Sequence, residues 1–328
     1  MTRSESGDVP ARSLSPDGAG ESSLLLQAFV GVLKARSTSA DDTADIRDFN
    51  AGQQREGVTR SDTDLGGVPA ITLEPRFNSP DRTVVYFHGG GYVSGSPPDR
   101  YLPLAAAVAL AANARVHAVD YRLAPETPFP GAFHDCLGAY RWLINDGATD
   151  PTTLAVLGDS AGGNLAVAMT VAARDEGLAL PASLAVISPF ADLTFTGASI
   201  SQRKEMDPYV TRELLESMAV AYVGAGSRDD PRCSAVFADL HGLPPLLIQV
   251  GENEILYDDA TRIRDAALSV GVEVTFESWR HGVHDWPVYI SAGIPESAIA
   301  IDHLAAFLRA HSNPGAVSTA GPPAIVRP

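Results

Sequence analysis

The stretch TLAVLGDSAGGNLAVAMTVAARDEG, residues 153–177, decides the fold of this chain. An apolar, strand-like run enters a glycine-rich turn around Ser160, and an alanine-rich helical run follows. Gly158 and Gly162 stand two residues before and after the serine, where a side chain would meet the crowded backbone of a tight turn. The pattern predicts strand, sharp turn and helix, with the Ser160 hydroxyl raised at the end of a sheet. A glycine-rich turn that only opens a helix reads similarly, so the interpretation depends on its partners.

Further apolar runs on both sides of this stretch alternate with helical segments. They are TVVYF (83–87), RVHAV (115–119), TLAVL (153–157), SLAVI (183–187), PLLIQV (245–250) and VEVTF (272–276). The runs are apolar almost throughout, which is typical of strands covered on both faces. They predict an α/β fold with a mostly parallel central sheet flanked by helices.

Composition limits the classes of partner. The 328 residues are 45% hydrophobic and carry a formal net charge of -16, which argues against binding to nucleic acid or to an anionic membrane surface. Two cysteines, Cys136 and Cys233, cannot build a disulfide framework or a cysteine zinc site, and they favour a reducing, cytoplasmic location. The sequence shows no signal-peptide pattern and no candidate membrane span.

Three kinds of segment are predicted along the chain. Residues 1–20 and 312–328 have the composition of disordered ends, and we exclude them from the fold. Residues 21–48 and 192–230 interrupt the alternation of strands and helices, and we expect them to lie together as a helical cap over the carboxyl ends of the strands, where open α/β sheets bind ligands. Residues 49–191 and 231–311 then form the catalytic domain.

A loop of three glycines follows the first apolar run, in His88-Gly89-Gly90-Gly91-Tyr92. Its backbone amides can approach a substrate oxygen closely, and we expect Gly90 and Gly91 to donate to an oxyanion together with Ala161. His88 precedes the glycines at a strand end, so we interpret it as structural. The lysine of a phosphate-binding loop and the spacing of a dinucleotide-binding motif are both missing from this stretch.

An acid and a base should follow the serine in such a fold. The run GENEILYDD, residues 251–259, offers four carboxylates. We choose Glu254, because Glu252 is too close to the strand end and the last two acids fall where a helix should begin.

Two histidines, His281 and His284, are candidates for the base, and local sequence does not separate them. Their spacing next to Asp285 would suit a metal, but further ligands at matching spacing are missing, so we expect no metal.

The set HGGGY, DYRLAPETPFPGA, GDSAGGNL, GLPPLLIQVGENEILYDDA and HDW resembles the bacterial hormone-sensitive-lipase-like branch of the α/β-hydrolases, over roughly residues 60–310. The resemblance implies that Glu254 fills the acid position, where aspartate is commoner. It also implies that His284, framed by Trp279 and Trp286, is the base and that His281 is not. The residues Asp120, Tyr121, Arg122 and Glu126 would support the glycine loop.

This resemblance implies an α/β-hydrolase fold with a helical cap, no cofactor, and esterase activity on small-molecule esters of short to medium acyl chain. We expect the substrate wall to include Tyr92, Asp159, Phe190, Tyr209 and Val210, with a core or loop role as the alternative for each. Lactone or amide hydrolysis on the same residues stays open, as does a non-catalytic binding protein with this fold. A homodimer is also left open.

Overall fold

A nine-stranded sheet organises the computed structural model, which describes residues 12–14, 22–36, 56–146 and 149–312. Its strand order is β1-β9-β8-β7-β6-β4-β5-β3-β2. The six predicted strands are confirmed and run parallel: β4 (Arg82–Phe87), β5 (Ala114–Val119), β6 (Leu154–Asp159), β7 (Ser183–Ile187), β8 (Leu246–Gly251) and β9 (Val274–Trp279). The α/β fold predicted from the apolar runs is therefore correct.

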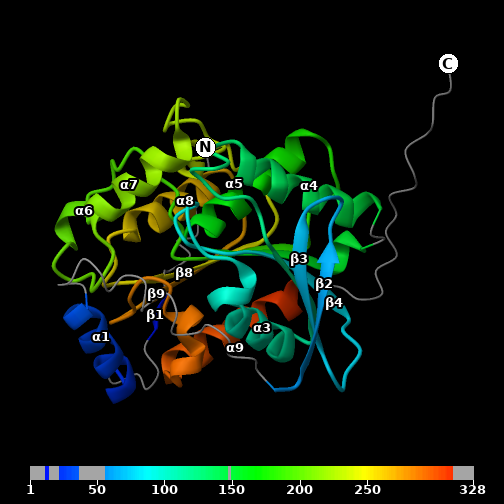
Figure 1. Cartoon of the computed structure of the whole chain (residues 1–328), viewed down its shortest axis with the longest axis horizontal. Helices are drawn as coiled ribbons and strands as arrows, with labels where there is room; N and C mark the ends of the chain where they lie inside the picture. Colours follow the sequence, from blue (N-terminus) through cyan, green and yellow to red (C-terminus); the bar gives the residue numbers. More distant parts are fainter. Residues whose placement is uncertain (1–11, 15–21, 37–55, 147–148, 313–328) are drawn as a thin grey trace, which may run out of the picture.

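Helices cover the sheet on both faces (Figure 1). On one face lie α4 (Gly131–Asn145), α5 (Ala161–Asp175) and α8 (Tyr257–Ser269), and on the other lie α3 (Leu102–Ala112) and α9 (Pro295–His311). Along β4, Val85 and Phe87 join the apolar cluster of the first face, whereas Val84 and Tyr86 join that of the second. Because both faces are buried, a parallel strand must be apolar at nearly every position.

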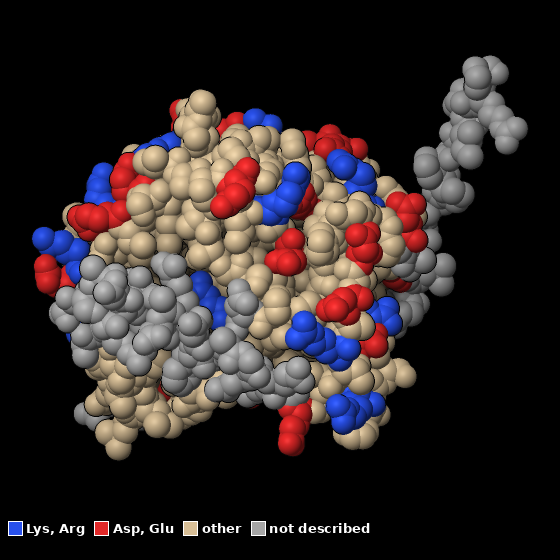
Figure 2. All heavy atoms as spheres, viewed as in Figure 1, with Lys and Arg blue, Asp and Glu red and all other residues tan. Residues whose placement is uncertain are grey.

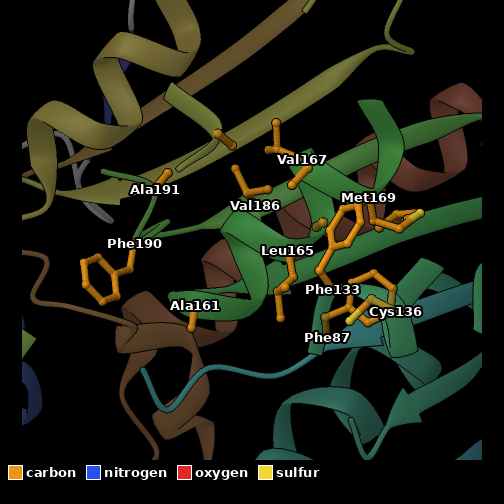
Figure 3. Packing of buried hydrophobic residues seen from close by; sticks show 14 of the residues in the cluster. Phe87, Phe133, Cys136, Ala161, Leu165, Val167, Met169, Val186, Phe190 and Ala191 are labelled. Atoms are coloured by element: carbon orange, nitrogen blue, oxygen red, sulfur yellow. The ribbon is translucent and has the colours of Figure 1, made fainter. Parts of the chain in front are cut away.

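Helix α5, which begins directly after Ser160, lies at the centre of the first face. Figure 3 shows Leu165 and Met169 of α5 close to Phe133 and Cys136 of α4, with Phe87 at the end of β4. These side chains are buried, and truncating Leu165, Met169 or either phenylalanine to alanine would cost about 2 to 5 kcal/mol in the free energy of unfolding. The packing fixes the position of the turn that precedes α5.

Two antiparallel strands at one edge of the sheet are additional to the predicted set. They are β2 (Val58–Asp64) and β3 (Pro69–Pro75), which pair with each other, and β3 also pairs with β5. Most residues of β2 are exposed, as befits an edge strand, so this strand lacks the apolar run that marks the others.

A short strand, β1 (Arg12–Leu14), lies at the opposite edge and pairs in parallel with β9. The exclusion of residues 1–20 from the fold is therefore wrong for these three positions, because backbone pairing needs no special composition. The remaining residues of that segment, like 313–328 at the other end of the chain, lie outside the described residues.

The two segments expected to form a cap contain three described helices. Helix α1 (Leu24–Arg36) packs Leu26 and Leu33 into an apolar cluster with Trp286 and contacts α9. The second segment contains α6 (Ser199–Gln202) and α7 (Arg212–Val223), and α6 contacts α8. Tyr209 of this second segment packs against the same apolar cluster as Leu26 and Leu33 of α1. Residues 37–48 of the first segment are outside the described part of the chain.

Short helical turns complete the fold. A π-helical turn, η1 (Pro97–Tyr101), leads into α3, and 3-10 turns occupy η2 (Pro151–Thr153), η3 (Ala235–Phe237) and η4 (Trp286–Ala292). In the face shown in Figure 2, acidic and basic side chains of the described residues are interspersed. The excess of acidic residues in the sequence therefore does not gather into one patch on this face.

Candidate active site

Ser160 occupies a strained turn between β6 and α5. Its backbone has φ 49° and ψ -118°, a region that L-residues seldom adopt, and its N–H donates to the Ile187 carbonyl at 2.9 Å. A Cβ on Gly158 would clash with the Gly162 backbone, and one on Gly162 would clash with the Phe87 carbonyl. The two glycines are thus required by crowding, as the sequence pattern predicts.

A continuous chain of hydrogen-bonding groups runs from this serine into the protein. Ser160 Oγ lies 3.0 Å from His284 Nε2, and His284 Nδ1 lies 2.9 Å from Glu254 Oε2. Glu254 is completely buried after β8, and His284 follows β9. The structure therefore brings together the three residues that the sequence nominates, whereas His281 stands at φ 63° in the same loop and has no hydrogen bond to Ser160.

Glu254 is held by two further donors. Its Oε1 accepts hydrogen bonds from Ser188 Oγ at 2.9 Å and from the Gly251 amide at 2.5 Å. Ser188, at φ 45° directly after β7, also accepts a hydrogen bond from the Asp285 amide at 3.2 Å. Sequence reasoning missed Ser188, because a lone serine after a strand carries no motif. These contacts fix the carboxylate so that Oε2 faces the imidazole.

The glycine loop lies beside the serine and exposes backbone donors. Gly90 has φ 107° and Gly91 has φ 63°, so both positions favour glycine. Among the described residues, the amides of Gly90, Gly91 and Ala161 have no hydrogen-bond acceptor. Ala161 is the first residue of α5, where the helix dipole favours a negative charge. These amides can bind a transient oxyanion.

His88 and Asp159 support this loop from beneath. The His88 ring is completely buried and stacks on Tyr121 with ring centroids 4.3 Å apart, and the Tyr121 hydroxyl donates to the His88 carbonyl at 2.5 Å. The Asp159 carboxylate is also buried and accepts hydrogen bonds from the Tyr86 hydroxyl at 2.5 Å and the Gly89 amide at 3.1 Å. For Asp159 the structure therefore has the loop hydrogen bond in place of contact with a substrate channel.

Arg122 anchors the neighbouring loop through a bidentate contact with Asp135, with Nη2 and Oδ1 separated by 2.6 Å.

Besides Asp159, the residues nominated for the substrate wall divide into two groups. Tyr92, Phe190 and Val210 are buried, and the Tyr92 hydroxyl donates to the Phe190 carbonyl at 2.8 Å. Tyr209 is half-buried, and its ring centroid lies 6.1 Å from that of His284. Of this set, Tyr209 is the residue placed beside the base.

Asp285 is the site residue that sequence reasoning assigned no part in the chemistry. Its Oδ2 lies 3.2 Å from His284 Nε2, the same nitrogen that faces Ser160. Its backbone adopts the left-handed conformation, with φ 56°, at the start of η4. The signal was its position directly after His284, where it was weighed only as a metal ligand.

The pKa of His284 results from opposing effects. Burial lowers the pKa of His284, but the carboxylates of Asp285 and Glu254 outweigh burial and raise the pKa well above its ordinary value. Burial also raises the pKa of Asp207 to about 6, although this carboxylate accepts hydrogen bonds from the Val210 and Ile255 amides. Within the described ranges, no cluster of three metal-ligating side chains occurs.

A serine at a strained strand–helix turn, a buried histidine and carboxylate, and a glycine loop with open amides define a serine hydrolase on an α/β sheet. The sequence matches the family described as alpha/beta hydrolase fold over residues 84–288. It is 44% identical to an acetyl-hydrolase of Streptomyces hygroscopicus over 234 residues, which cover 71% of this chain and 77% of that protein.

Other relatives point to the same branch. An esterase of Acinetobacter venetianus is 33% identical over 244 residues, covering 74% of this chain and 79% of its own. The crystal structure of an esterase from the bacterial hormone-sensitive lipase family superposes with a TM-score of 0.84 at 36% identity, covering 89% of this chain and all of that one. The chain therefore belongs to the α/β-hydrolase family, in its bacterial hormone-sensitive-lipase-like branch. No helix in the described ranges has the length and apolar character needed to cross a membrane.

Proposed function

We propose that this chain, a serine carboxylester hydrolase, cleaves esters of short to medium acyl chain through Ser160, His284 and Glu254. The observation that carries the proposal is the unbroken contact from Ser160 Oγ through His284 to Glu254, at 3.0 and 2.9 Å. Relatives named acetyl-hydrolase, esterase and carboxylesterase support ester bonds as the target. No cofactor enters the proposed reaction.

The reaction proceeds in two acyl transfers. His284 Nε2 accepts the hydroxyl proton while Ser160 Oγ attacks the ester carbonyl carbon, and Glu254 stabilises the imidazolium that forms. The amides of Gly90, Gly91 and Ala161 bind the oxyanion of the tetrahedral intermediate. His284 then gives its proton to the alkoxy oxygen, and the alcohol leaves. A water molecule, activated by the same nitrogen, releases the acyl group and restores the serine.

The two helical segments are proposed as a cap over this site, with residues 49–191 and 231–311 as the catalytic domain. Support for the cap comes from α7, since a Cβ on Gly91 would clash with the Met218 side chain of that helix. Tyr222 of α7 stacks on Tyr92 with ring centroids 3.9 Å apart. Tyr92, Asp159, Phe190 and Val210 would then shape the wall through their packing, whereas Tyr209 faces the base.

Two further points of the proposal concern the cellular location and the oligomeric state of the chain. Cys136 and Cys233 are both buried free thiols, which supports a cytoplasmic location. Light scattering after size exclusion distinguishes a homodimer from a monomer.

Replacing Ser160 by alanine tests the function. We expect wild-type protein to hydrolyse p-nitrophenyl acetate and butyrate, and S160A to lose several orders of magnitude in kcat while it still binds substrate. Ser269→Ala, an exposed serine on α8, is the matched control and should keep full activity. Wild-type protein that is inactive on both esters, or S160A as active as S269A, would refute the proposal. Matched lactone and amide substrates, assayed with the same variants, distinguish those activities from ester cleavage.

A further inference from the structure

The carboxylate of Asp285 is built into the site by its backbone. The Asp285 amide donates to Ser188 Oγ at 3.2 Å, and its carbonyl accepts a hydrogen bond from the Val288 amide at 2.9 Å. Its left-handed backbone conformation, with φ 56°, turns the chain immediately after His284. The side chain is consequently positioned with Oδ2 at 3.2 Å from His284 Nε2.

The second oxygen of this carboxylate has no partner. Asp285 Oδ1 is buried and lacks any hydrogen bond, and no arginine or lysine within the described ranges lies at ion-pair distance from either oxygen. The side chain is 9% exposed. A buried carboxylate oxygen without a donor is costly, and a ligand that carries an N–H group is one partner that would satisfy it. Ser160, which must meet the substrate, is about as enclosed, at 5% exposure.

Asp285 lies on the side of the base from which the alcohol departs. During the proposed reaction, His284 Nε2 delivers its proton to the alkoxy oxygen of the ester, so that oxygen must come within hydrogen-bond distance of Nε2. A group 3.2 Å from the same nitrogen is then within reach of the first few atoms of the alcohol. The carbonyl oxygen, by contrast, faces the glycine loop and the α5 N-terminus.

The surroundings favour a cation at this position. Tyr209 and Tyr289 have hydroxyl oxygens 3.5 Å apart, and the Tyr209 ring centroid lies 6.1 Å from that of His284. Phenol rings stabilise cations that approach their faces. The buried carboxylates Asp159, Asp207 and Glu254 act on the same base. The opposing charge is Arg100, which acts on both Tyr209 and Tyr289. Its guanidinium donates to the Tyr101 hydroxyl at 2.6 Å and forms no ion pair with Asp285, so the carboxylate keeps its charge for a ligand.

We infer that Asp285 forms a subsite for a protonated amine carried on the alcohol portion of the ester. The inference rests on the proposed ester hydrolysis and specifies its substrate class. An ammonium group two carbons from the alkoxy oxygen donates its N–H to the Asp285 carboxylate. This contact gives Asp285 Oδ1 the donor that it lacks among the described residues.

Binding of such a substrate also assists the base. Oδ2 and Ser160 Oγ both lie at hydrogen-bond distance from His284 Nε2, so the free carboxylate competes for the proton that the base must give to the alkoxy oxygen. A substrate ammonium draws the carboxylate into its own ion pair and weakens that competition. Separately, the Asp285 charge helps to raise the pKa of His284, and neutralising it lowers that pKa toward the range that suits a general base.

A pair of isosteric esters tests the subsite. 2-(Dimethylamino)ethyl butyrate carries a protonated amine, and 3-methylbutyl butyrate has a CH group in its place. The measured quantity is the ratio of kcat/KM for the two esters, because any effect of a substitution on His284 itself cancels in that ratio. We expect wild-type protein to prefer the amine by about ten- to a hundredfold, as for a hydrogen bond to a charged group.

Asp285→Asn is the informative variant, since asparagine tolerates the left-handed backbone and keeps the shape of the side chain. The preference should fall to within about threefold in D285N, by loss of the charge-assisted hydrogen bond. Asp265→Asn removes the same charge from an exposed position on α8, where the side chain is 64% exposed, and should keep the wild-type ratio.

The possible results separate the two hypotheses. A wild-type ratio near one, or a ratio that D285N leaves unchanged, overturns the subsite while the hydrolysis of both esters upholds the proposed function. Wild-type protein that hydrolyses neither ester overturns the proposed function and the subsite together. A preference that falls equally in D265N and D285N assigns it to net charge and also overturns the subsite.

Discussion

Glu254→Gln tests the role of the acid most directly, because the structure determines how a glutamine would sit there. Glu254 Oε1 accepts hydrogen bonds from Ser188 Oγ and the Gly251 amide, whereas Oε2 faces His284 Nδ1. In E254Q the amide oxygen must take the first position, since both partners there are donors. The amide NH2 then faces Nδ1, and it stabilises the tautomer that carries its proton on Nε2.

That tautomer cannot accept the proton of Ser160. We expect kcat on p-nitrophenyl butyrate to fall by about 10³- to 10⁴-fold, or about 4 to 5.5 kcal/mol in activation free energy, the size found when a triad carboxylate becomes an amide. The free energy of unfolding should change far less, because the side-chain shape and the contacts of its oxygen are kept. Denaturant unfolding of the same sample checks this.

Glu252→Gln is the matched control. Glu252 lies two residues earlier in the same loop and accepts a hydrogen bond from Ser278 Oγ at 3.1 Å, away from His284. Its kcat should stay within about threefold of wild type, as for a surface-type substitution. Activity of E254Q above a tenth of wild type, or equal losses in the two variants, would show that Glu254 does not orient the base.

Three further outcomes are expected. His284→Ala should lower kcat by several orders of magnitude and His281→Ala by little, because His284 Nε2 is the nitrogen that contacts Ser160 Oγ. Equal, mild losses of kcat in the two variants would contradict this. Gly90→Ala should cost at least about a hundredfold in kcat/KM, since its φ is 107° and a Cβ would clash with the Ser94 carbonyl; an active, folded variant would exclude Gly90 from the oxyanion site. Burial, and second the nearby Asp192 charge, raise the pKa of Asp259 to about 8. Because an aspartate in the unfolded chain titrates at about 4, the free energy of unfolding of the wild type falls as the pH rises from about 4 to 8. The thermal midpoint of D259N should therefore rise relative to that of the wild type as the pH rises across that window. A difference in midpoint that does not change with pH would refute this prediction.

The sequence could predict the parallel sheet because its signals are local. Each parallel strand is buried on both faces and is therefore an apolar run. The crowded turn at Ser160 requires Gly158 and Gly162, and these two glycines are visible in the sequence. Strand β2 carries no such signal, since an exposed edge strand has little apolar surface to bury. Strand β1 pairs with β9 over three residues, a length too short to carry a pattern that predicts a strand.

Site residues divide in the same way. The triad candidates stand in motifs at strand ends, but the choice of His284 over His281 needed family resemblance, because both lie in one loop. Ser188 and Asp285 contact Glu254 and His284 through the fold, from positions that are ordinary in sequence. Asp159 ends β6, and its side chain accepts a hydrogen bond from the Gly89 amide, which is the loop role that the sequence leaves open beside a place in the substrate wall.

The chain around residues 191–210 exchanges buried hydrogen bonds with the loop and helix that follow β8. Asp207 of this segment accepts a hydrogen bond from the Ile255 amide at 3.0 Å, next to Glu254, and Asp259 accepts two at 2.8 Å from the Ala191 and Asp192 amides. The acid loop and the insertion thus hold each other through buried carboxylates on backbone donors. Because such bonds hold the two backbones together, we expect a change in this segment to shift Glu254 and so to alter kcat together with specificity.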